Sequence, residues 1–199
     1  MKRFLGHQHL LVRFISLYAL GLILFFTSWT TSYYLLPEGL LSGMGILPTL
    51  AGDSAADTLA SEFATIFLLN MAGFSLILIG NYVLRVGYFG FGGLVPLAWM
   101  VLYGVTLGTN SFGIPMAEPM APSIAVFGRS GLYEMMAAVL LAVSTSTISA
   151  NYSENFRSSS VPVPKSERKM DREHWIGAVI AILLLALAAM REAYMIVNL

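Results

Sequence analysis

Glu134 is the residue of this chain whose type and place raise a question of chemistry. It lies inside an apolar stretch, close after Arg129. A carboxylate in such a stretch is costly unless it has a partner, and it then usually faces the protein interior. Two interpretations remain open. Glu134 either caps a half-solvated helix start, where backbone N–H groups and the helix dipole favour an anion, or it is buried and holds another helix or a ligand.

Asn70 and Asn81 are the other polar side chains in apolar surroundings. They lie eleven residues apart, about three helical turns, with Gly73 on the same side. Amide side chains hydrogen-bond across helix contacts, and small residues such as Gly104 and Gly108 let helix backbones approach. We interpret these residues first as contacts within a helix bundle, and second as the lining of a substrate path.

The remaining residue types exclude several classes of site. The chain has no Cys, so thiol nucleophiles, disulfides and thiolate metal sites are excluded. His7 and His9 are two residues apart, a spacing that does not align side chains on a helix. No HExxH motif and no Ser/His/Asp set is present. We therefore expect no enzyme, no cofactor and no metal site, and the zero net charge gives no reason to expect a nucleic-acid partner.

The elements that position these residues follow from the distribution of charge. Only 11% of the residues are charged, and five long stretches contain no charged side chain or almost none. Each stretch is near or above the length of about 17 residues that a helix needs to cross a bilayer core. The sequence predicts an all-α, polytopic integral membrane bundle formed by a single domain, 1–199, with spans at 14–36, 63–84, 94–112, 131–150 and 175–197.

The basic residues predict how the bundle is oriented. Cytoplasmic loops are enriched in Lys and Arg. With the N-terminus in the cytoplasm, nine of the eleven basic residues lie on the cytoplasmic side: Lys2, Arg3, Arg13, Arg85, Arg157, Lys165, Arg168, Lys169 and Arg172. The segment 151–174 is then a cytoplasmic linker. Its Ser and Pro residues favour an extended chain, and Ser166 is a candidate cap for a following helix.

This threading predicts one contact between spans. The second and fourth spans both run from outside to inside, and Asn70 and Glu134 lie at similar depths in them. We expect the two side chains to face the interior and to lie near each other, directly or through one water.

Three short segments, FATIFLLNMAGFSLILIG, GVTLGTN and RSGLYEMMAAVLL, resemble the stage II sporulation protein M family of five-span bacterial and archaeal membrane proteins. The family's apolar-Asn motif matches residues 67–70. Its His-Gly-x-x-Glu motif matches Gly131 and Glu134, whereas Ser130 stands at the His position. The resemblance implies that Glu134 is a signature position. It also implies partners, because the best-known member works with peptidoglycan hydrolases and some members look like permease partners of ABC-type ATPases.

The sequence leaves three functions open. The first is a non-enzymatic scaffold or assembly subunit of a larger complex in a bacterial or archaeal cytoplasmic membrane. The second is a permease subunit of an ABC-type transporter, and the third is an accessory subunit of a respiratory or photosynthetic complex. The expected partners are the lipid bilayer, other membrane subunits or an ABC-type ATPase, and a second copy of the chain.

Overall fold

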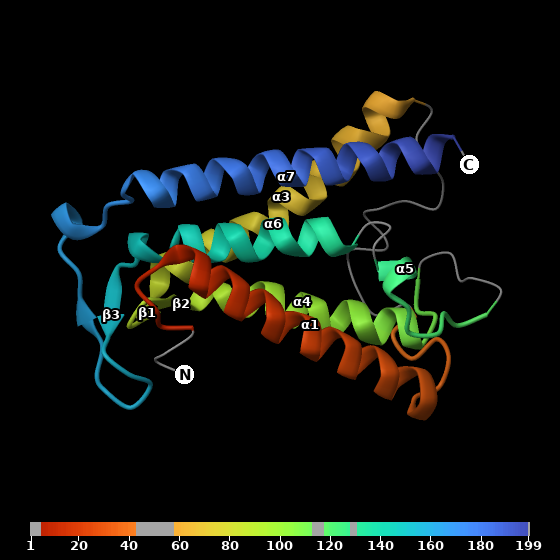
Figure 1. Cartoon of the computed structure of the whole chain (residues 1–199), viewed down its shortest axis with the longest axis horizontal. Coiled ribbons are helices and arrows are strands. Elements are labelled where there is room, and N and C mark those ends of the chain that lie inside the picture. The colour runs from red at the N-terminus through yellow and green to blue at the C-terminus, as the bar shows by residue number, and fades with distance from the viewer. Residues whose placement is uncertain (1–4, 43–57, 113–117, 128–130, 199) are drawn as a thin grey trace.

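The structure, a computed structural model, describes residues 5–42, 58–112, 118–127 and 131–198. It is a bundle of long helices with a small sheet at one end (Figure 1). Five helical segments are long and apolar enough to cross a membrane. They are α1 (Leu10–Leu35), α3 (Leu59–Val83), α4 (Leu94–Gly108) with the preceding 3-10 turn η1 (Phe91–Gly93), α6 (Gly131–Ser144) with the following 3-10 turn η2 (Ser146–Ile148), and α7 (Arg172–Val197).

These five segments overlap the five predicted spans. α1, α3 and α7 begin before their predicted starts at 14, 63 and 175, and two other spans end earlier than predicted. The third span was predicted to continue to 112, but α4 ends at Gly108, and Asn110 follows with a positive φ of 52°. Asn tolerates this left-handed conformation better than most residues, so it suits a helix end. The fourth span was predicted to reach 150, but α6 ends at Ser144 and only a 3-10 turn follows.

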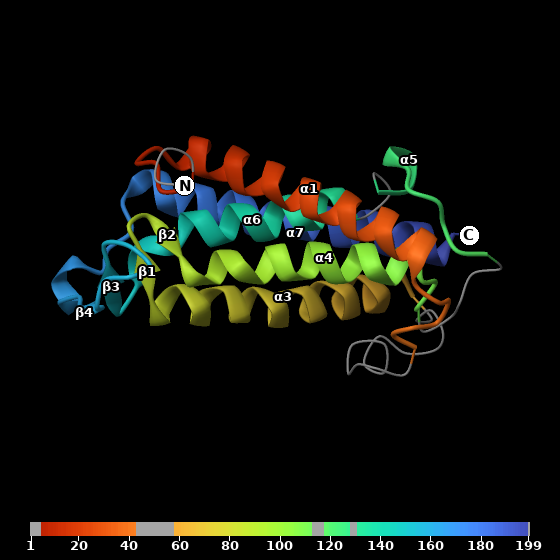
Figure 2. The ribbon, with the colours of Figure 1, turned by 90° about the horizontal axis from the view of Figure 1, so that it is seen from below.

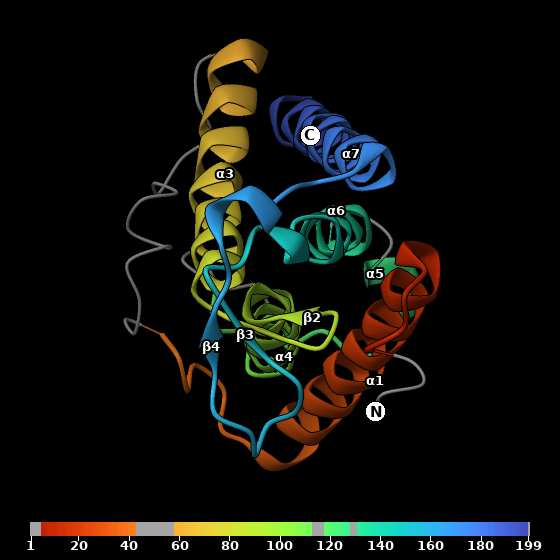
Figure 3. The ribbon, with the colours of Figure 1, turned by 90° about the vertical axis from the view of Figure 1, so that its left-hand side faces the viewer.

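Helix α6 lies at the centre of the bundle (Figures 2 and 3), where it contacts α1, α3, α4 and α7. On one side, Val139 and Val143 join a core with residues of α1 and α4, among them Phe25 and Met100. On the other side, the alanines of α6 pack against α3 and α7. The small side chains of α6 therefore let four neighbours approach it.

The contact between α1 and α4 depends on two glycines. A Cβ atom at Gly104 would lie 2.6 Å from the carbonyl oxygen of Phe25, and one at Gly108 would lie 2.7 Å from the backbone nitrogen of Tyr33. Both distances are shorter than real Cβ contacts allow. The predicted role of Gly104 and Gly108 in close helix packing is therefore present, and their partner is α1.

A four-stranded sheet closes the end of the bundle at which α1 begins, and we call this end the sheet end. Its strand order is β2 (Phe89–Gly90), β1 (Arg85–Val86), β3 (Asn151–Ser153) and β4 (Val161–Pro162). β1 pairs in parallel with β3, so the loop between α3 and α4 is joined to the segment that follows α6. Gly87, with a φ of 59°, opens the two-residue turn between β1 and β2, as glycine favours there.

The segment 151–174 is thus more structured than an extended linker. It contributes two strands and a 3-10 turn, Lys165–Glu167. The prediction that Ser166 caps a helix is wrong, because Ser166 lies inside that turn, whose cap is Pro164. The cap of the long helix is Asp171, which accepts a hydrogen bond from the backbone N–H of His174.

Candidate functional site

The polar residues that the sequence singles out lie in two separate places. In the half of the bundle away from the sheet, the Nδ2 atom of Asn70 lies 3.3 Å from the Oε1 atom of Glu134 and donates a hydrogen bond to it. This is the contact predicted between the second and fourth spans, and it is direct. Both side chains are partly buried. Arg129, the predicted neighbour of Glu134, lies outside the described residues.

Glu134 has a second partner that the sequence analysis missed. Its carboxyl group hydrogen-bonds to that of Glu192 on α7, and Glu62 of α3 lies near Glu192. A hydrogen bond between two carboxyl groups needs a proton on one of them, because a carboxylate only accepts. Glu134 thus connects α6 to both α3 and α7. Glu192 could have been identified from the sequence as a candidate partner, because it is an acidic residue near the end of the last predicted span.

The side chain of Asn81 is buried near the sheet end, and both its oxygen and its nitrogen form hydrogen bonds. Its side chain is 0% exposed, and its Nδ2 atom donates to the carbonyl oxygen of Ala142 and to the Oγ1 atom of Thr145, both at 2.7 Å. Its Oδ1 atom accepts from the backbone N–H of Gly92 at 2.9 Å. These three bonds tie α3 to α6 and to the start of α4. This pairing agrees with the interpretation of Asn81 as a contact within the bundle.

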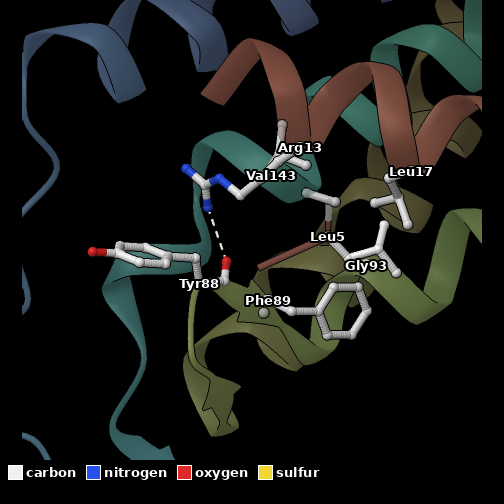
Figure 4. Close-up of a pocket in the computed structure, with 9 residues that line it drawn as sticks. Leu5, Arg13, Leu17, Tyr88, Phe89, Gly93 and Val143 are labelled. Carbon is white, nitrogen blue, oxygen red and sulfur yellow. Dashed lines mark hydrogen bonds between the residues drawn. The ribbon is translucent and has the colours of Figure 1, made fainter. Parts of the chain in front are cut away.

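The largest polar cluster forms around Arg13, in the first turn of α1. Arg13 is 1% exposed, although it is charged. Its Nη1 atom donates to the carbonyl oxygen of Tyr88 at 2.9 Å (Figure 4) and to the Oγ atom of Ser146 at 2.7 Å. Its Nη2 atom lies 2.9 Å from the Nε2 atom of His174. One side chain thus joins α1 to the β1–β2 turn, to η2 and to α7.

His174 extends this cluster to the surface. It is 7% exposed, and its Nδ1 atom lies 2.7 Å from the Oδ1 atom of Asp171. The backbone and ring hydrogen bonds from His174 hold the pKa of Asp171 below its ordinary value, so this carboxylate is ionised at neutral pH. The charge of Arg13 is therefore linked through an imidazole to an exposed anion.

A small cavity and a surface pocket adjoin this cluster. The cavity, about 10 Å³, lies beside Arg13 and is walled mainly by Leu17, Phe89 and Val143 (Figure 4). It leaves room for at most about one water molecule. Among the described residues, the Nε atom of Arg13 is buried without a hydrogen-bond partner. The pocket, about 370 Å³, has aromatic walls that include Phe156.

Arg13 was expected only as a basic residue on the cytoplasmic side, and His174 was not among the predicted site residues. The signal for Arg13 is its position between Leu10 and Leu17, which lie on the same buried face of α1. The signal for His174 is its place three residues after the capping Asp171. Neither signal identifies the partner, because Arg13 and His174 are 161 residues apart.

Comparison with family models, curated proteins and solved structures finds no match for this chain. The resemblance to the stage II sporulation protein M family therefore rests on the motifs quoted above, in which Asn70 and Glu134 match the motif positions for Asn and Glu.

Proposed function

We propose that the chain is a non-enzymatic scaffold or assembly subunit of a larger complex in a bacterial or archaeal cytoplasmic membrane, with its N-terminus in the cytoplasm. The observation that carries this proposal is the sheet end. There, loops that connect membrane-length helices are folded into a sheet and are fixed by Arg13 and Asn81. A rigid surface of this kind suits the docking of another protein better than a loose linker does.

The sheet end also exposes both apolar and basic side chains. Phe156 is 61% exposed, Val161 56% and Trp175 60%. Partner surfaces are enriched in aromatic residues. We call the exposed surface formed by Phe156 and Val161 the platform. Lys165, Lys169 and Arg172 are exposed nearby, which agrees with a cytoplasmic position.

A copurification experiment tests this proposal. The tagged chain is expressed in its native membrane and isolated in mild detergent, and the bound proteins are identified. We expect a membrane or cytoplasmic subunit to copurify, and expect Phe156→Ser combined with Val161→Ser to reduce its yield at least about tenfold, since apolar anchors dominate interface energies. Ile124→Ser is the matched control, because Ile124 is 79% exposed but lies outside the sheet end. If both variants retain the partner equally, the platform is not the docking surface.

The second candidate function is a permease subunit, and the carboxyl pair of Glu134 and Glu192 favours it. Carboxyl groups within spans are common in ion and proton pathways. The same purification distinguishes the two functions. An ATPase as the copurifying protein, together with ATP-dependent solute movement in liposomes that Glu134→Gln abolishes, would replace the scaffold proposal with transport.

A further inference from the structure

The hydrogen bonds of His174 define where its protons lie. Asp171, as a carboxylate, only accepts hydrogen bonds, so the Nδ1 atom of His174, 2.7 Å away, carries a proton. Arg13 only donates, so the Nε2 atom of His174, 2.9 Å from Nη2, must present a lone pair. The observed arrangement therefore requires a neutral imidazole that is protonated on Nδ1.

A second proton on His174 is incompatible with this contact. It would place an N–H group on Nε2 against the N–H group of Arg13, with two positive charges at hydrogen-bond distance. The titratable and charged groups around the contact come from each neighbouring element: Arg13 from α1, Arg85 and Tyr88 from the β1–β2 hairpin, and Asp171 and Glu173 from the start of α7. η2 contributes the hydroxyl group of Ser146, which accepts from Arg13.

These groups do not compensate for the added charge. Arg13 is buried and Arg85 adds a like charge near it, whereas Asp171 and Glu173 are exposed, so water screens them. Asp171 already accepts two hydrogen bonds from His174 in the observed state, so protonation gives it no new bond. The contact between His174 and Arg13 therefore breaks when the imidazole is charged.

We propose that His174 is a protonation-sensitive latch that fastens the start of α7 to Arg13 and, through Arg13, to the β1–β2 hairpin. The latch is closed when His174 is neutral, so its contribution to stability is present at high pH and is lost as pH falls. Histidine is the side chain that most commonly acts as a charge switch near physiological pH. The proposal does not depend on the scaffold function.

What the latch controls follows from its position. His174 lies in the first turn of α7, directly after the segment that carries β3 and β4. Its partner Arg13 also holds the carbonyl oxygen of Tyr88, next to β2. Opening of the latch therefore loosens both sides of the sheet end, while the contact between α1 and α4 at Gly104 and Gly108 stays intact.

The experiment uses the full chain in nanodiscs. The chain has three histidines, so His7→Gln with His9→Gln leaves His174 alone for nitrogen NMR of ¹⁵N-labelled histidine. We expect the neutral form with its proton on Nδ1 where the latch is closed, and the charged form only where the latch has opened. A neutral form with the proton on Nε2 would overturn the proposal.

Hydrogen exchange of the same protein measures the opening. We expect the amides of 174–178, corrected for their intrinsic exchange rates, to lose protection by up to about tenfold per pH unit below the transition, as linkage to one proton requires. Amides of the α1–α4 contact should not change. Equal protection at pH 8 and pH 5 in 174–178 would also overturn the proposal.

Two variants complete the test. His174→Gln keeps an oxygen that can accept from Arg13 but takes up no proton, so the amides of 174–178 should stay protected at pH 5. The variant that lacks His7 and His9 but keeps His174 is the matched control, and it should retain the loss of protection. The latch is refuted if His174→Gln keeps the pH dependence of the wild type or if the control variant lacks it.

Discussion

Individual polar side chains in this bundle differ in how completely they are paired. Asn81 is 0% exposed and uses both ends of its amide group for contacts with α6 and η1, whereas Asn70 is partly buried and forms a longer bond of 3.3 Å to Glu134. The cost of removing a buried hydrogen-bonding group depends on what is left unpaired. These two asparagines, eleven residues apart on α3, therefore form a matched pair for a comparison.

We expect Asn81→Ala to lower the free energy of unfolding in detergent by about 1–3 kcal/mol, because the buried backbone N–H of Gly92 and the hydroxyl of Thr145 lose a partner. Asn70→Ala should cost only about 0.6 kcal/mol, the average for a hydrogen bond between membrane helices. Chemical denaturation followed by circular dichroism measures both values. An equal loss for the two variants would show that the packing of Asn81 does not depend on its three hydrogen bonds.

At the scale of the elements, α1 and α4 approach each other through glycine rather than through large side chains. The spacing of Gly104 and Gly108 was readable from the sequence because both residues fall on one helix face. The sequence did not predict that α1 is the neighbour of α4, because all of the spans are similarly apolar. The two- and three-residue strands were not predicted, since they are too short to show an alternating pattern.

We expect Gly108→Leu to destabilise the bundle strongly, because even a Cβ atom there would lie 2.7 Å from the backbone nitrogen of Tyr33 and 2.8 Å from the carbonyl oxygen of Trp29. Backbone atoms cannot move away cheaply, so α1 and α4 must separate. Val101→Leu on the exposed face of α4 adds bulk without this clash and should be neutral. Thermal melting in detergent measures both, and a melting temperature of Gly108→Leu within about 2 °C of the wild type would contradict the expected separation.

At the scale of the whole molecule, the site was partly predictable. Asn70 and Glu134 were expected to meet because their direction and depth follow from the order of the spans, and the structure joins them. Arg13, His174 and Glu192 were missed as a group because their contacts depend on which helices are neighbours. The distribution of charged residues predicts the orientation of the bundle, and hydropathy predicts where the helices lie. Neither predicts which helices are neighbours of α6.

The orientation of the bundle remains a prediction, and the two ends of the structure offer sites to measure it. Ser159 is exposed at the sheet end, and Ser42 is exposed in the loop after α1. Since the chain has no native Cys, Ser159→Cys and Ser42→Cys each introduce a single thiol.

The excess of Lys and Arg on the sheet end predicts that, in intact cells, a membrane-impermeant maleimide labels Ser42→Cys and labels Ser159→Cys only after lysis. Trp175, which is 60% exposed at the start of α7, would then lie at the cytoplasmic interface, where tryptophan is enriched. Labelling of Ser159→Cys in intact cells would show that the bundle has the opposite orientation. The platform and the latch at His174 would then lie outside the cytoplasm.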